Sequence, residues 1–158
     1  MDKSVQKIYG NQTRIRVAGL CWDSTNILLV NHWGLYHHDF WAPPGGGVEF
    51  GDSAEQNLMR EFKEETGLEI QVGEFRFACE FIAPPLHAIE LYFDVIVSGG
   101  GLRMGNDPEM GKKEQIITEV KYMSESELEA LPRGHKHGLF SLGKKVEKIR
   151  ELKGYLKI

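Results

Sequence analysis

The sequence predicts an α/β fold of the mixed, α+β kind, in which a mixed β-sheet is covered by helices. Short runs that read as strands recur along the chain, and one amphipathic helix lies among them. Strands and helices interleave without strict alternation, which favours a mixed sheet over a purely parallel one. A length of 158 residues is close to that of one domain, so we expect residues 1–158 to form a single unit.

The elements before and including the main helix can be placed by their turn and cap residues. Ser53 is expected to cap a helix that runs to about Thr66, with Gln56 as its capping-box partner. Gly67 then ends the helix in the left-handed conformation. The extended segments before this helix are Arg14 to Trp22, Asn26 to His32 and Phe40 to Ala42.

The second half of the chain contains further strands, a long loop and two short helices. The two prolines of Ala83 to Leu86 mark a break between strands, because a central strand does not tolerate them. The polar, glycine-rich stretch from Ser98 to Lys113 is typical of a binding loop, a lid or a disordered segment. The predicted strands are Phe75 to Ile82, Ile89 to Val97 and Ile116 to Met123, and the predicted helices are Glu125 to Leu131 and Leu142 to Leu152.

Composition and charge limit the functions that we consider. The formal net charge of -4 argues against broad nucleic-acid binding, which needs a basic surface. Cys21 and Cys79 lie far apart and outside any metal-ligand pattern, so we expect free thiols in a reducing compartment. The first residues lack the apolar core of a signal peptide, and no run has the length of a membrane span. A cytoplasmic protein without a membrane partner is expected.

The main helix places three carboxylates on one face. Glu61, Glu64 and Glu65 are three and four residues apart, so their like charges repel. Two of them lie in the last turn, where the helix dipole favours cations. Leu58 and Phe62 fall beside them, which puts the acids at the edge of the buried surface. Hard oxygen ligands in this position suit Mg²⁺ or Mn²⁺, although a solvated acidic face is the alternative.

A run of three glycines before this helix favours a ligand site beside the carboxylates. Gly45, Gly46 and Gly47 allow positive φ and close approach of the backbone to a ligand. They also leave carbonyl oxygens free to face a metal ion. A tight strand-to-helix connection without chemical role is the alternative. A phosphate-cradling P-loop is excluded, because no Gly-Lys-Ser/Thr follows.

The segment from Gly46 to Leu68 resembles the Nudix box, G-x5-E-x7-R-E-U-x-E-E-x-G-U, where U is a bulky apolar residue. The matching residues are Gly46, Arg60, Glu61, Phe62, Glu64, Glu65, Gly67 and Leu68. Asp52 stands where the family has glutamate. Its carboxylate is one methylene shorter, which changes its reach to Arg60 or to a metal-bound water.

The resemblance implies a Nudix-type α/β/α sandwich in which the box forms a loop-helix-loop beside the sheet. It implies a MutT-like hydrolase that cuts a phosphoanhydride bond in a nucleoside diphosphate derivative, with Arg60 orienting the carboxylates. The general base would be Glu61 first, then Glu114 or Glu119. The implied ligands of Mg²⁺, with Mn²⁺ as an alternative, are Glu61, Glu64, Glu65 and the carbonyl of Gly45.

The expected partner is a small nucleotide, with ADP-ribose and nucleoside triphosphates as leading candidates. Gly45 and Gly46 would approach it with their backbone, and Trp41 could stack on its base or simply pack at a strand entry. Pro84 lies about where ADP-ribose-cleaving members carry a proline. A homodimer is left open.

Two other functions on the same fold are considered. One is a nucleotide sensor without catalysis, although such proteins usually lack the box carboxylates that this chain keeps. The other is isomerisation of an isoprenoid diphosphate, which needs a catalytic cysteine. Cys79 is the candidate, and a small apolar strand residue is the alternative for it.

Overall fold

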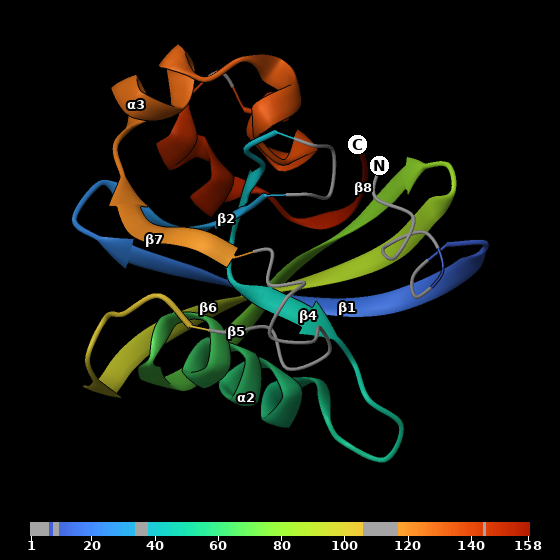
Figure 1. Cartoon of the computed structure of the whole chain (residues 1–158), viewed down its shortest axis with the longest axis horizontal. Coiled ribbons are helices and arrows are strands. Elements are labelled where there is room, and N and C mark those ends of the chain that lie inside the picture. Colours follow the sequence, from blue (N-terminus) through green and yellow to red (C-terminus); the bar gives the residue numbers. More distant parts are fainter. Residues whose placement is uncertain (1–6, 8–9, 34–37, 106–116, 144) are drawn as a thin grey trace.

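The computed structural model describes residues 7, 10–33, 38–105, 117–143 and 145–158. In Figure 1 the strands form a central layer, with the helix α2 (Ala54–Thr66) on one side of it. The short helix α3 (Glu125–Ala130) and three 3-10 segments lie on the other side. The 3-10 segments are η1 (Arg133–His135), η2 (Gly138–Ser141) and η3 (Val146–Glu151). The predicted α/β/α sandwich is confirmed.

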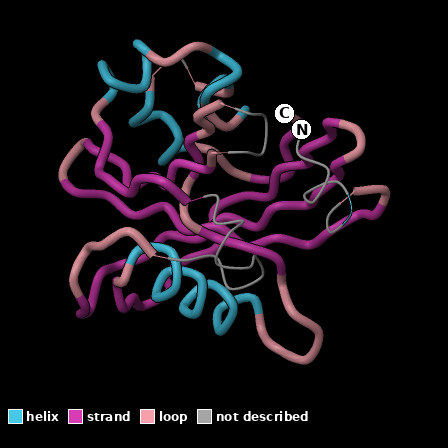
Figure 2. The backbone as a smooth tube through the Cα atoms, in the orientation of Figure 1, coloured by secondary structure: helices cyan, strands magenta, loops and turns pink. Residues whose placement is uncertain are grey.

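The described strands form one connected sheet, which is drawn in magenta in Figure 2. Its order is β3-β2-β1-β6-β5-β8, with β4 paired to β1 and β7 paired to β2. The pairs β1–β6 and β5–β8 are parallel and the others antiparallel, so the sheet is mixed as predicted. The bounds are β1 Gln12–Asp23, β2 Asn26–His32, β3 Trp41–Ala42, β4 Gly45–Gly47, β5 Leu68–Ala83, β6 Leu86–Gly100, β7 Ile117–Met123 and β8 Gly154–Lys157.

Strand β1 supplies side chains to two hydrophobic cores because its residues alternate between the faces of the sheet. Val17 and Cys21 pack with Leu58 and Phe62 of α2. Ala18 and Leu20, on the opposite face, pack with residues of β2, β5, β6, α3, η2 and η3. The face opposite α2 therefore carries the larger of the two cores.

Helix α2 begins and ends as its sequence predicts. The Ser53 side chain accepts a hydrogen bond from the Gln56 N–H, and the Gln56 side chain accepts one from the Ser53 N–H. Gly67 has φ 73° and donates its N–H to the carbonyl of Lys63. These caps satisfy backbone groups at both ends, so the box helix has fixed limits.

The C-terminal segment differs from the prediction. Instead of one helix from Leu142 to Leu152, the structure has the 3-10 segment η3 and then strand β8, which the sequence analysis missed. Val146 and Ile149 are the buried residues of η3, and their spacing of three matches one turn of a 3-10 helix. Gly154 has φ 81° and starts β8.

Strands β5 and β6 are longer than predicted, because β5 begins directly after the cap glycine and β6 continues into the glycine-rich stretch. The glycine run, expected to be a turn, pairs with β1 as strand β4. Most of the predicted loop from Ser98 to Lys113, from residue 106 on, lies outside the described residues.

Candidate active site

The predicted carboxylates lie on the side of α2 that faces β4. Glu61 and Glu65 are 7% and 5% exposed. Both are held inside because Leu58 and Phe62, on the adjoining face of the helix, are fully buried against the sheet. The Glu64 side chain is 29% exposed. The prediction that the acids line the edge of the buried surface is confirmed.

The glycine strand β4 lies directly against two of these carboxylates. The Gly45 N–H donates to Glu65 Oε2 at 2.9 Å. A Cβ built on Gly46 would lie 2.3–2.7 Å from the carboxyl atoms of Glu61, closer than a side chain can approach. A side chain at this position would therefore force the Glu61 carboxylate to move. Gly46 thus lets β4 contact the carboxylate helix with Glu61 in its present position.

Arg60 connects the carboxylates of the helix with the loop before it. Its Nη2 lies 3.3 Å from Glu61 Oε1 and 3.0 Å from Glu49 Oε1. Its Nη1 donates to Glu64 Oε2 at 3.0 Å. Nη2 also donates to the side chain of Asn57. This arrangement fits the predicted role of Arg60 in orienting the carboxylates.

Arg60 pairs with Glu49 of the loop before the helix, and no described contact joins it to Asp52. Asp52 is exposed, and no described ion pair or hydrogen bond involves its carboxylate. Glu49, three residues earlier, reaches Arg60 instead. The sequence analysis missed Glu49, although its position in the glycine-to-helix loop was a usable signal. The loop carboxylate that pairs with Arg60 is therefore Glu49 and not Asp52.

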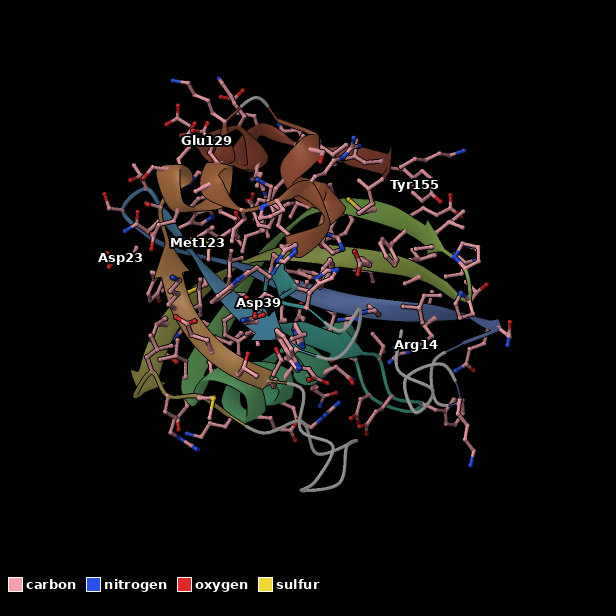
Figure 3. All side chains as sticks on the ribbon, turned by 45° about the horizontal axis from the view of Figure 1, so that its top comes forward. Arg14, Asp23, Asp39, Met123, Glu129 and Tyr155 are labelled. Atoms are coloured by element: carbon pink, nitrogen blue, oxygen red, sulfur yellow. The ribbon has the colours of Figure 1, made fainter. Side chains whose placement is uncertain are left out.

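A second polar cluster lies on the opposite face of the sheet from α2. Glu90 of β6 pairs with Arg16 of β1, with 3.7 Å between Oε1 and Nε. His137 Nε2 lies 2.9 Å from Glu90 Oε2, and the Tyr92 hydroxyl donates to the same oxygen at 3.2 Å. On this side, Figure 3 labels Asp39 between the end of β2 and the 3-10 segments, where it accepts a hydrogen bond from Asn31 at 2.8 Å.

The hydrogen bonds of this cluster determine its charges. The Leu139 N–H donates to His137 Nδ1, so Nε2 carries a proton toward Glu90. Burial alone would raise the pKa of Glu90, but His137 and Arg16, with the Tyr92 hydroxyl, lower it to about 2. Glu90 is therefore an anion whose charge is balanced inside the protein.

His32 lies near this cluster and is 9% exposed. In the described part of the chain, its Nδ1 is buried without a hydrogen-bond partner. Burial, followed by the charge of Arg16, lowers its pKa to about 3. The imidazole is therefore neutral at physiological pH.

The neutral His32 should make the fold sensitive to acid. Unfolding restores its pKa to about 6.5, so the unfolded chain binds a proton first and stability falls as pH drops below that value. Between pH 7 and pH 5 we expect a loss of about 2 kcal/mol from this residue. Urea denaturation at the two pH values measures it.

The variant His32→Gln should lose that part of the pH dependence. The partly exposed His87, replaced by glutamine, serves as control for the loss of a histidine and should leave the contribution of His32 in place. Equal slopes of unfolding free energy against pH for His32→Gln and the unchanged chain would show that His32 is not buried in neutral form.

The remaining predicted site residues are placed as follows. Trp41 is 4% exposed and belongs to the larger core, which favours the packed strand entry over base stacking. Glu119 is exposed on β7 and pairs with Lys121 at 3.7 Å. Glu114 lies outside the described residues. Arg16 and His137 were missed, and the only sequence signal for Glu90 was the alternation of β6.

The carboxylate site fits a hard divalent cation by its donor chemistry. Two carboxylates, on Glu61 and Glu65, are buried in a site that also holds Glu49 and Glu64. Within the described ranges, no three histidine, cysteine or carboxylate side chains already enclose a metal position. A cation would therefore require side-chain rotations in a site whose ligand type and charge suit it.

The structure is a mixed-sheet sandwich in which the carboxylates of α2 lie against the glycines of β4. This arrangement is the one expected of a Nudix-type protein. The sequence pattern of the NUDIX domain matches residues 12–141. The chain belongs to the Nudix family. Among the described residues, no helix has the length and apolar character to cross a membrane.

Three proteins with known names or structures are similar to this chain, to different extents. An ADP-ribose pyrophosphatase of Methanocaldococcus jannaschii is 34% identical over 95 residues, which cover 59% of this chain and 56% of that protein. A Nudix hydrolase structure from Nitrosomonas europaea has a TM-score of 0.67 at 19% identity and covers 89% of both chains. An ADP-ribose pyrophosphatase structure from Streptococcus suis has a TM-score of 0.59 at 16% identity, covering 90% of this chain and 98% of that one. The two structures show a shared fold.

Proposed function

We propose that this protein is a Mg²⁺-dependent hydrolase that cleaves a phosphoanhydride bond in a nucleoside diphosphate derivative. The observation that carries the proposal is the pair of buried carboxylates, Glu61 and Glu65, packed against the backbone of β4. Burying like charges on one helix face lowers stability, so their placement is best explained by a ligand of opposite charge. Membership of the Nudix family supports the same reading.

The residues have distinct roles in this proposal. Glu61, Glu64 and Glu65, with the Gly45 carbonyl, would hold the ion, and Arg60 would keep two of the carboxylates in position. When bound, Mg²⁺ supplies charge neutralisation at the diphosphate and acidifies the attacking water. Glu61 is the first candidate to accept the proton of that water, and Glu114 and Glu119 are the alternatives.

ADP-ribose is the first substrate to test. The relative from Methanocaldococcus jannaschii is named an ADP-ribose pyrophosphatase, but the match spans 56% of its length. Pro84, at the turn between β5 and β6, adds a small preference for the same substrate. Nucleoside triphosphates remain the second class, in agreement with the MutT-like box.

The test is a hydrolysis assay with Mg²⁺ and a panel of ADP-ribose, nucleoside triphosphates, oxidised nucleotides and dinucleotides. Products are separated by anion-exchange chromatography, and ADP-ribose should yield AMP and ribose 5-phosphate. Turnover should disappear in EDTA and in Glu64→Gln. A folded protein that cleaves nothing on this panel would overturn the proposal.

Glu49 should support the site through Arg60. Replacing it with glutamine removes a charged partner 3.0 Å from Arg60, so the Mg²⁺ concentration for half-maximal activity should rise about 10-fold. Asp52→Asn is the matched control, since its carboxylate has no described partner, and its activation curve should stay unchanged. If Asp52→Asn raised the Mg²⁺ concentration for half-maximal activity more than Glu49→Gln, Glu49 would not be the loop carboxylate that supports Arg60.

The isomerase alternative is not supported by the position of its cysteine. Cys79 is fully buried in the larger core. Burial, followed by the charge of Glu90, raises its pKa to about 12. Such a thiol stays protonated and out of reach of a substrate. The sensor alternative is likewise disfavoured, because Glu61, Glu64 and Glu65 are all retained.

A further inference from the structure

We propose that Arg16 is a substrate-binding residue that holds a phosphate of the diphosphate, and that Glu90 and His137 are positioning residues for its guanidinium. The inference rests on the proposed function and extends it to the other side of β4, beyond the Nudix box. It assigns a purpose to a buried ionic cluster that metal binding does not use.

Gly45 connects the two groups of polar residues. Its N–H donates to Glu65, and its carbonyl accepts a hydrogen bond from Arg16 Nη2 at 3.3 Å. Burial lowers the pKa of Arg16, but the charge of Glu90, followed by that of Glu65, raises it, which agrees with the proximity of Arg16 to the carboxylate helix. A diphosphate whose metal-bound oxygens lie near the carboxylates would therefore extend toward Arg16.

The guanidinium of Arg16 has donors to spare for such a ligand. Its side chain is 31% exposed, in contrast to 8% for Glu90 and 6% for His137. Within the described residues its contacts are one long hydrogen bond and the ion pair with Glu90 at 3.7 Å. Guanidinium donors match two oxygens of a phosphate. An arginine built only for the fold would be expected to use more of its donors.

The other members of the cluster fix the position of this cation. Glu90 is anchored on one oxygen by His137 at 2.9 Å and Tyr92 at 3.2 Å, and its other oxygen faces Arg16. His137 is in turn oriented by the Leu139 N–H at 3.2 Å. This chain of contacts runs from η2 to β1, so Arg16 is held from outside the box.

An unpaired buried nitrogen points to a ligand in the same region. His32 Nδ1 lacks a hydrogen-bond partner within the described ranges, although His32 lies close enough to Arg16 for this charge, after burial, to lower its pKa. Buried polar atoms in proteins almost always have a partner. A polar group of the substrate, or water around it, would satisfy this nitrogen.

The experiment is calorimetric binding with Mg²⁺, which does not depend on turnover. The probes are α,β-methylene ADP-ribose, methylenediphosphonate, which is the phosphate part alone, and adenosine, which has no phosphate. Arg16→Gln should weaken both phosphate-containing probes about 10- to 100-fold and leave adenosine unchanged. Arg16→Lys keeps the charge without the two-oxygen geometry and should fall between.

Arg76→Gln is the matched control for Arg16. Arg76 is also a partly buried strand arginine, with a side chain 20% exposed, and it pairs with Asp94. Its loss should not change the Kd of any probe. An Arg16→Gln or Arg16→Lys protein with native melting temperature and unchanged Kd for both phosphate probes would overturn the proposal. Absence of probe binding by the unchanged protein would do the same.

The positioning role is tested by combining Glu90→Gln with Arg16→Gln. Alone, Glu90→Gln should weaken the phosphate probes about 10-fold. In the Arg16→Gln background it should add no further loss, because Glu90 acts through Arg16. Additive losses would remove Glu90 from this role.

The two proposals can fail separately. If the analogue binds through Arg16 but ADP-ribose and the rest of the panel are not cleaved, the proposed hydrolase function fails and the role of Arg16 in diphosphate binding stands. If ADP-ribose is hydrolysed with the same KM and the analogue binds with the same Kd after Arg16→Gln, only the role of Arg16 fails.

Discussion

Glu61→Gln is expected to lower kcat for ADP-ribose by at least about 100-fold at saturating Mg²⁺, while the protein stays folded. Glutamine keeps the size of the side chain, so its packing beside Gly46 is preserved. Arg60 keeps Glu49 and Glu64 as partners. The lost charge is the one that would hold the cation and accept the proton of water. Steady-state kinetics across a Mg²⁺ series measure the effect.

Stability measurements should separate this effect from damage to the fold. Removing one of the three carboxylates on this face of α2 relieves repulsion, so we expect the melting temperature of Glu61→Gln to change by less than about 3 °C. Glu55→Gln is the control on the same helix, because Glu55 lies in the first turn and is exposed. It should keep full activity. Activity of Glu61→Gln within a few-fold of the unchanged protein would contradict a direct role of this carboxylate.

The box helix could be predicted closely because its signals are local. Ser53 and Gln56 form the cap through bonds three residues apart, and Gly67 ends the helix through its own backbone conformation. The spacing of Glu61 and Glu65 sets their common face. Such features depend on neighbours within one or two helical turns, so the sequence alone contains them.

The cluster of Arg16, Glu90 and His137 could not be predicted, because its residues come from segments that are far apart in the sequence and meet only in the folded chain. Arg16 and Glu90 become neighbours through the parallel register of β1 and β6, and His137 arrives from the segment after α3. No local pattern determines which parallel strand lies beside β1. Glu90 and Tyr92 are two residues apart on a strand and so share one face of the sheet, but this spacing does not show that the face carries a buried ion pair.

The C-terminal prediction was wrong for a related reason. The charged run from Leu142 to Leu152 has residues that favour a helix, yet only Val146 and Ile149 reach the core. Their spacing of three allows a 3-10 segment to bury both while Gly154 turns the chain into β8. Tertiary packing thus outweighs helix propensity, which is a weak local preference.

Gly45→Ala is expected to cost at least about 3 kcal/mol of unfolding free energy. A Cβ on Gly45 would lie 2.0 Å from the Val17 carbonyl oxygen and 2.7 Å from the Ala18 Cα, and its φ of 155° strains a residue with a side chain. These neighbours are backbone atoms of β1, so no side-chain rotation relieves the overlap. Strand β4 must move away, which breaks the Gly45 hydrogen bonds to Glu65 and Arg16.

Two further glycines separate a loss of the fold from a loss of the site. Gly101→Ala should be neutral in urea denaturation, since nothing lies within 4 Å of its added Cβ. Gly46→Ala meets the movable carboxylate of Glu61, so it should lose activity with a smaller loss of stability than Gly45→Ala. If Gly45→Ala were as stable as Gly101→Ala, β4 would not be packed tightly against β1. Gly45 would then not hold Glu65 and Arg16 in fixed positions on either side of β4.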